Sequence, residues 1–124
     1  MDKISALRGA ITVEKDDPIE IEKSVKELFE KLLKYNNLSE DDLINVNFTI
    51  TSDLKSRNPA AALRKANYCS NVALFCSQEP EIDNMLEKVI RIMILCYKDK
   101  NQLKHVYLNR AAQLRKEYAI EENN

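Results

Sequence analysis

The sequence predicts an α/β or α+β fold, with a mixed sheet of about five strands and two helices covering one face. Segments rich in β-branched or alternating apolar residues recur along the chain, and two helical segments separate them. The length of 124 residues suits one domain. We expect that domain to span residues 1–116, followed by a polar, flexible tail at 117–124.

The first two elements are a strand and an amphipathic helix. Residues 4–13 end in β-branched residues and predict a strand, in which the only glycine, Gly9, indicates a bulge or a close backbone approach. A helix begins at Asp17 as N-cap, with Pro18 at N1 and Glu20 completing a capping box. Its apolar face is formed by Ile21, Val25, Leu28, Phe29 and Leu32, and the pattern ends near residues 35–37.

The middle of the chain predicts two strands around a second helix. A short capped turn at 39–42 precedes a strand at 43–51, where apolar and polar residues alternate. Asn58 and Pro59 cap a helix over 60–67, and residues 72–77 predict a third strand.

The last elements leave one sheet face uncovered. Residues 86–97 are ambiguous, since their apolar run favours a buried strand but a helical turn before it is possible on pattern alone, and 106–108 predict a short final strand. Residues 92–95 are apolar on both faces, and the tail is too short to cover the second one. We therefore expect sheets of several copies to associate in a closed oligomer.

Composition and charge exclude several function classes. The net charge of -1 provides no general attraction for nucleic acid or an anionic membrane, so a few placed cations must hold any anionic ligand. The cysteine count is odd and lacks a C-x-x-C pair, and no signal peptide or membrane-spanning run is evident. We expect a cytoplasmic protein with reduced thiols. No glycine-rich phosphate loop, nucleophile elbow or H-E-x-x-H motif occurs.

Several residues could carry chemistry, and each also has a structural interpretation. Arg91 interrupts an apolar strand, where it must be paired, point outward or bind an anion. Arg8 fits a surface position, and Cys76 fits a small buried side chain. Glu79 at a strand end is usually solvated, and the lone His105 favours a structural or surface role.

Five segments in register resemble one enzyme family, the small trimeric bacterial chorismate mutases. They are 7–14 (LRGAITVE), 51–64 (TSDL followed by NPAAALR), 76–79 (CSQE), 90–93 (IRIM) and 105–115 (HVYL followed by LR). The resemblance implies an α+β fold related to ferredoxin-like folds and a homotrimer in which packed sheets form a pseudo-barrel. It also implies active sites shared by two chains, with no cofactor and no metal.

The implied reaction is the Claisen rearrangement of chorismate to prephenate, a step in phenylalanine and tyrosine biosynthesis, without a covalent intermediate. The resemblance assigns Arg91 to the ether oxygen and one carboxylate, Arg8 to a carboxylate, and Glu79 to the ring hydroxyl with Cys76 beside it. Tyr107 would donate to a carboxylate. The other implied substrate-binding residues are Arg64 and Arg115 at the mouth, with Phe75, Leu74, Asn58, Ala60 and Leu114.

Three positions depart from the family pattern. Asn58 replaces a bulky aromatic residue, Ala61 replaces a lysine with Arg57 as the nearest cation, and Phe75 replaces a small hydroxyl residue. These changes predict a weaker substrate affinity.

Two alternatives to an enzyme remain from the sequence. The chain could form a non-catalytic trimeric binder of a small anionic metabolite, or a structural oligomer in which Arg91 and Glu79 pair with each other.

Overall fold

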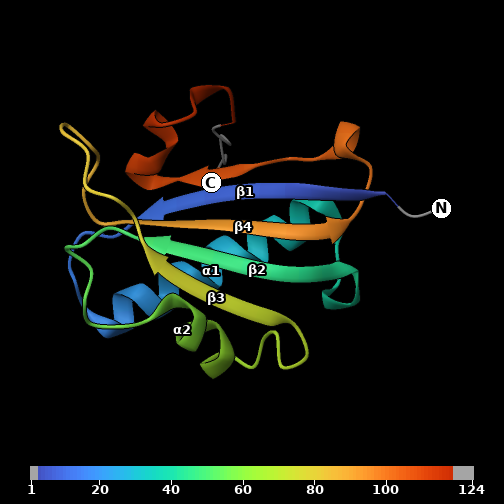
Figure 1. The fold of residues 1–124 in the computed structure, drawn as a ribbon, viewed down its shortest axis with the longest axis horizontal. Coiled ribbons are helices and arrows are strands. Elements are labelled where there is room, and N and C mark those ends of the chain that lie inside the picture. The colour runs from blue at the N-terminus through green and yellow to red at the C-terminus, as the bar shows by residue number, and fades with distance from the viewer. Residues whose placement is uncertain (1–2, 119–124) are drawn as a thin grey trace.

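The computed structural model describes residues 3–118, which form one five-stranded sheet with both helices on the same face (Figure 1). The strand order is β3-β2-β4-β1-β5; β4 pairs antiparallel with β1 and β2, whereas β5 and β3 run parallel to them. This confirms the predicted mixed sheet. The elements are β1 (Ile4–Thr12), α1 (Pro18–Asn36), β2 (Leu43–Ile50), α2 (Pro59–Lys65), β3 (Ala73–Gln78), β4 (Val89–Tyr97) and β5 (Val106–Leu108). Short 3₁₀ turns occupy Glu40–Asp42, Lys100–Gln102, Asn109–Gln113 and Lys116–Tyr118.

The ambiguous segment at 86–97 resolves into β4, which begins at Val89, and no helical turn precedes it within the described residues. Of the expected tail at 117–124, residues 119–124 lie outside the described residues. Among residues 3–118, no helix has the length and apolar character needed to cross a bilayer.

Gly9 is a point of close backbone approach, and the register of β1 with β4 runs through it without a shift. A Cβ at this position would lie 2.9 Å from the carbonyl oxygen of Val106 on β5. Of the two expectations for Gly9, close approach is confirmed and a bulge is not. The missing side chain lets β5 pair beside β1 at the sheet edge, which places Tyr107 opposite Ala10.

The start of α1 differs in one contact from the expected capping box. Asp17 accepts from Glu20 N at 3.0 Å, as expected. The Glu20 side chain does not return to Asp17 but accepts from Glu14 N at 2.6 Å. The carboxylate therefore ties the start of the β1–α1 connection to the first turn of the helix. At α2 the prediction is confirmed, because Asn58 accepts from Ala60 N at 2.8 Å.

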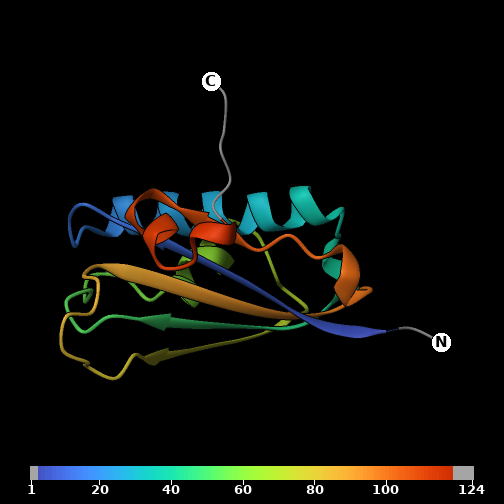
Figure 2. The same ribbon diagram turned by 90° about the horizontal axis from the view of Figure 1, so that it is seen from above.

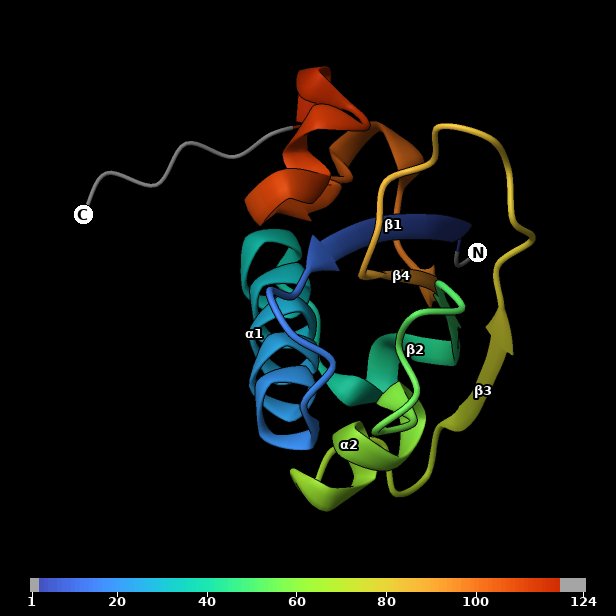
Figure 3. The ribbon, with the colours of Figure 1, turned by 90° about the vertical axis from the view of Figure 1, so that its left-hand side faces the viewer.

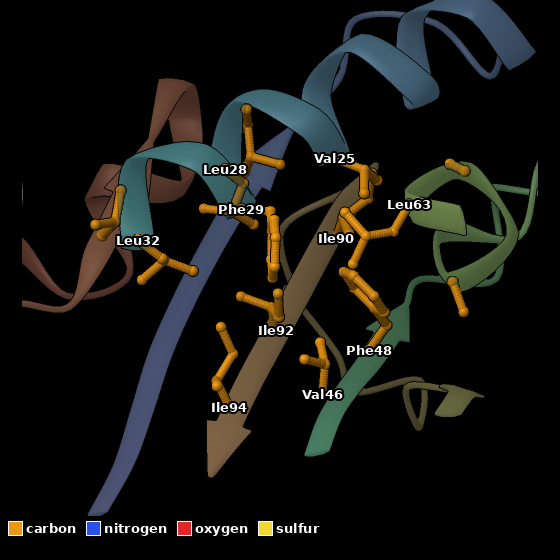
Figure 4. Packing of buried hydrophobic residues seen from close by; sticks show 14 of the residues in the cluster. Val25, Leu28, Phe29, Leu32, Val46, Phe48, Leu63, Ile90, Ile92 and Ile94 are labelled. Carbon is orange, nitrogen blue, oxygen red and sulfur yellow. The ribbon is translucent and has the colours of Figure 1, made fainter. Parts of the chain in front are cut away.

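The core lies between the sheet and the helices. Phe29 and Leu32 of α1 face Phe48 of β2 and Ile92 of β4, and all four are at most 3% exposed (Figure 4). Figure 2 shows α1 lying along one side of the sheet, and Figure 3 shows α2 on the same side. The alternate residues of each strand therefore point to the other side, which we call the open face.

The open face carries a mixture of polar and apolar side chains. Met93 and Tyr97 of β4 are 41% and 46% exposed there. Residues 3–118 cover one corner of it, where Ala10, Val89 and Tyr107 pack against Ala111 of the turn at Asn109–Gln113. The expectation that this chain leaves a sheet face without its own cover is confirmed for the described residues.

Candidate active site

A cavity of about 350 Å³ lies on the open face, across the middle of the sheet. Four strands contribute to its walls. Residues two apart on one strand point to the same side, so neighbouring strands present their open-face residues together. The lining residues are Arg8 and Gly9 of β1, Asn47 and Thr49 of β2, Arg91, Ile92 and Met93 of β4, and Tyr107 of β5. The structure thus brings together three of the residues expected at the site: Arg8, Arg91 and Tyr107.

Glu79 reaches this group through Arg91. Its carboxylate oxygen Oε1 lies 2.5 Å from Arg91 Nε, and the same oxygen accepts from Thr49 Oγ1 at 2.7 Å. The Glu79 side chain is only 11% exposed, whereas that of Arg91 is 40% exposed. A guanidinium has five N–H donors, so Arg91 can hold Glu79 through Nε and still donate to an anion in the cavity.

Arg8 and Tyr107 are positioned by the pairing of β1 with β5. The backbone N–H of Arg8 donates to His105 Nδ1 at 3.0 Å, immediately before the ladder begins at Gly9 and Val106. Burial and the nearby Arg8 and Arg115 guanidinium groups lower the pKa of His105. A neutral imidazole is needed for Nδ1 to accept this bond, so the structural role expected for His105 is the one observed.

Six of the expected site residues lie elsewhere on the chain. They form what we call the β3–α2 edge: Asn58, Ala60, Arg64, Leu74, Phe75 and Cys76. Leu74 and Cys76 point to the helix side of β3 and pack against the core, whereas Phe75 points to the open face and is 66% exposed. Within one chain, Cys76 does not lie beside Glu79 at the cavity, because alternation along β3 turns it to the opposite face.

Burial raises the pKa of the Cys76 thiol. A partly buried thiol with a raised pKa is a poor nucleophile, since the thiolate is the reactive form. The structure therefore favours Cys76 as a packing or polar contact. Arg64 is exposed in the last turn of α2, where it can meet an anion brought by another molecule.

Leu114 and Arg115 follow the strand that carries Tyr107. Leu114 packs on the cluster that contains Tyr107, and Arg115 pairs with Glu117, its Nε lying 2.7 Å from the carboxylate. The charge of Arg115 is one of the causes that lower the pKa of His105, the residue that accepts from Arg8 N. Neither Leu114 nor Arg115 lines the cavity itself, and the role of Arg115 at its mouth stays a prediction.

Two residues at or near the departures from the family pattern, Asn58 and Arg57, have structural roles of their own. Asn58 caps α2, a role that a bulky aromatic side chain cannot fill. Arg57 pairs with Glu22 of α1, with 3.0 Å between Nη2 and Oε1, and it does not line the cavity of its own chain.

Five cavity residues were not expected at the site from the sequence, among them the open-face residues Asn47, Thr49 and Met93; the other two are Gly9 and Ile92. The signal was present, because Asn47 and Thr49 form the polar side of an alternating strand and their register partners on β4 are Met93 and Arg91. Among the described residues, no group of three potential ligands could hold a metal ion. The cavity offers two guanidinium groups and a phenol, and the largely buried Glu79 carboxylate lies against one of the guanidinium groups. This set suits a dianion that carries a hydroxyl group.

Comparisons with known proteins agree with this arrangement. The model of the family described as chorismate mutase type I matches residues 4–118. The chain is 34% identical over 122 residues to chorismate mutase AroH of Bacillus subtilis, covering 97% of this chain and 96% of the relative. It is 38% identical over 115 residues to chorismate mutase AroH of Thermus thermophilus, covering 90% and 93%. A solved chorismate mutase from Clostridium thermocellum superposes with a TM-score of 0.83 at 40% identity, covering 88% of this chain and 98% of that one.

Proposed function

The chain belongs to the chorismate mutase type I family, and we propose that it rearranges chorismate to prephenate at the open-face cavity. The observation that carries the proposal is the grouping of Arg91, Arg8 and Tyr107 around one cavity in a chain of this family. The reaction supplies the precursor for phenylalanine and tyrosine biosynthesis.

The rearrangement is internal to the substrate and balances without a co-reactant. One C–O bond of the enol ether breaks as one C–C bond forms, and no proton or electron leaves the molecule. The protein can accelerate it by holding the compact conformer in which the reacting carbons meet. It can also direct a fixed positive charge at the ether oxygen, where negative charge develops in the transition state.

Each charged or polar residue at the cavity has a separate role in this reaction. Arg91 stabilises the ether oxygen and one carboxylate, because its charge is permanent and Glu79 holds it in place at 2.5 Å. Arg8 and Tyr107 bind carboxylate oxygens from the β1 and β5 side. Glu79 accepts from the ring hydroxyl through Oε2, since Oε1 is engaged by Arg91 and Thr49.

The site is completed by a second copy of the chain. The β3–α2 edge carries six expected substrate-contacting residues but lies outside the cavity of its own chain. The open face also exposes apolar side chains such as Met93 and Tyr97, whose burial would favour association. These features support a homotrimer in which the edge of one copy closes the cavity of the next, and a mass measurement in solution tests it.

Location in the cytoplasm is part of the same proposal. It is supported by the three cysteines, which are all free thiols in the structure.

Steady-state kinetics of Arg91 variants tests the proposal. Arg91→Ala should lower kcat by orders of magnitude with a smaller change in KM, because the interaction is made chiefly in the transition state. Arg91→Lys should restore little, since an ammonium group lacks the planar fork. If Arg91→Ala kept kcat and raised only KM, Arg91 would bind the ground state alone and the mechanism would be wrong.

The same variants separate catalysis from the structural alternative. If Arg91 and Glu79 served only to stabilise the fold, the double variant would show strong coupling in the free energy of unfolding and wild type would leave chorismate unchanged. A wild type that binds chorismate without converting it would identify an anion-binding protein instead.

A further inference from the structure

Thr49 lies beside the ion pair between Arg91 and Glu79. It is the register partner of Arg91 on the neighbouring strand, and both side chains point to the open face. Its hydroxyl donates to Glu79 Oε1 at 2.7 Å, the oxygen that lies 2.5 Å from Arg91 Nε. One carboxylate oxygen is therefore fixed by two donors from adjacent strands.

Glu79 needs such support because it comes from the far side of β2. It follows β3, the edge strand, and its backbone N–H donates to Ile50 O of β2 at 2.9 Å. Arg91 lies on β4, beyond β2, so the Glu79 side chain must cross over β2 to reach it. Thr49 is the β2 residue that the side chain meets on the way.

A threonine is suited to this position. Its β-branched side chain has few χ1 rotamers, so the hydroxyl is a donor of nearly fixed direction. Glutamate has three rotatable side-chain bonds and loses considerable freedom when held in one conformation. A stiff donor under the carboxylate selects one conformation before a substrate arrives, which is the condition for electrostatic preorganisation.

We propose that Thr49 is a positioning residue for the rearrangement, and this inference rests on the proposed function. Its hydroxyl holds Glu79 Oε1 against Arg91, which leaves Oε2 to accept the ring hydroxyl of the substrate. Thr49 acts on the substrate through Glu79. Removing the hydroxyl lets the carboxylate take other conformations, and Arg91 loses its fixed partner.

Three variants at this position and its partner test the inference in the chorismate assay. Thr49→Val keeps the shape and removes the donor, whereas Thr49→Ser keeps the donor. Glu79→Gln removes the charge through which Thr49 acts. Ser52→Ala is the matched control, because Ser52 Oγ also donates to a carboxylate, that of Glu81, but outside the cavity.

We expect Thr49→Val to lower kcat/KM about tenfold with kcat carrying most of the loss, and Thr49→Ser to stay within about threefold of wild type. In the Glu79→Gln background, Thr49→Val should have less than about a twofold further effect, because residues that act as a unit are not additive. The melting temperature of Thr49→Val should stay close to that of wild type, and Ser52→Ala should keep full activity.

Separate outcomes overturn the inference and the proposed function. An active wild type with an equally active Thr49→Val, or effects of Thr49→Val and Glu79→Gln that multiply, would overturn the positioning role alone. If the activity of Thr49→Val fell only as far as its fraction of folded protein falls, the positioning role would also be overturned. A wild type that leaves chorismate unchanged would refute the proposed function and, with it, this inference.

Discussion

Replacing Gly9 with alanine tests how closely β1 and β5 must approach to place Tyr107 at the cavity. The new Cβ would lie 2.9 Å from the Val106 carbonyl oxygen and 3.1 Å from Ile92 Cγ2 and from Leu28 Cδ1. The two methyl groups can shift by a few tenths of an ångström, but the carbonyl moves only if β5 moves. Overpacking of this kind costs about 1–3 kcal/mol.

The unfolded chain offsets part of that loss. Alanine restricts the unfolded state and returns about 0.4–1 kcal/mol, so Gly9→Ala should lower the free energy of unfolding by about 1–2 kcal/mol. Urea unfolding followed by circular dichroism, at one protein concentration, measures it. Ser70→Thr adds a methyl group at an exposed turn and should change the free energy by less than about 0.5 kcal/mol. A Gly9→Ala midpoint equal to that of wild type would refute the close-packing argument.

Two further predictions concern the core and the β1–β5 junction. Phe48→Ala should cost about 3–5 kcal/mol in urea unfolding because Phe48 is 1% exposed, whereas Ile19→Ala at a 65% exposed site should change less than about 0.5 kcal/mol; equal losses would contradict the core assignment. Burial and the charges of Arg8 and Arg115 lower the pKa of His105 below its value in the unfolded chain. The contribution of His105 to stability is therefore present above about pH 6.5, and it is lost as the pH falls through the lowered pKa. His105→Asn keeps an acceptor for Arg8 N but does not titrate, so wild type should lose more stability between about pH 7.5 and about pH 5 than this variant; equal losses would contradict the effect.

Much of the fold follows from local patterns that need no knowledge of tertiary contacts. The alternation at 43–51 and the caps at Asp17 and Asn58 predicted β2, α1 and α2 to within a few residues. The apolar run around Arg91 could not be resolved by periodicity, because a strand with apolar residues on both faces and a buried helical segment share such runs. Its pairing with β1 and β2, both distant in sequence, settles it as β4.

The sequence predicted several of the residues that meet at the site, but it predicted less of how their side chains are placed. Arg8, Arg91 and Tyr107 were expected together and line one cavity. The role of Thr49 was missed because it depends on the crossing of Glu79 over β2, which no local pattern contains. The position of Cys76 on the core side follows from the phase of β3, which sequence spacing to Glu79 alone does not reveal.

Mixed oligomers of two impaired variants test the central claim that neighbouring copies share a chorismate mutase site. Arg91→Ala damages the cavity on the open face, and Arg64→Glu reverses a charge on the exposed β3–α2 edge. If each site combines the cavity of one copy with the edge of the next, about a quarter of the sites in a random equal mixture contain neither change. Co-expressed variants should then convert chorismate at about a quarter of the wild-type rate, although each parent alone is nearly inactive. Mixed oligomers as inactive as their parents would show that the site is not shared in this way.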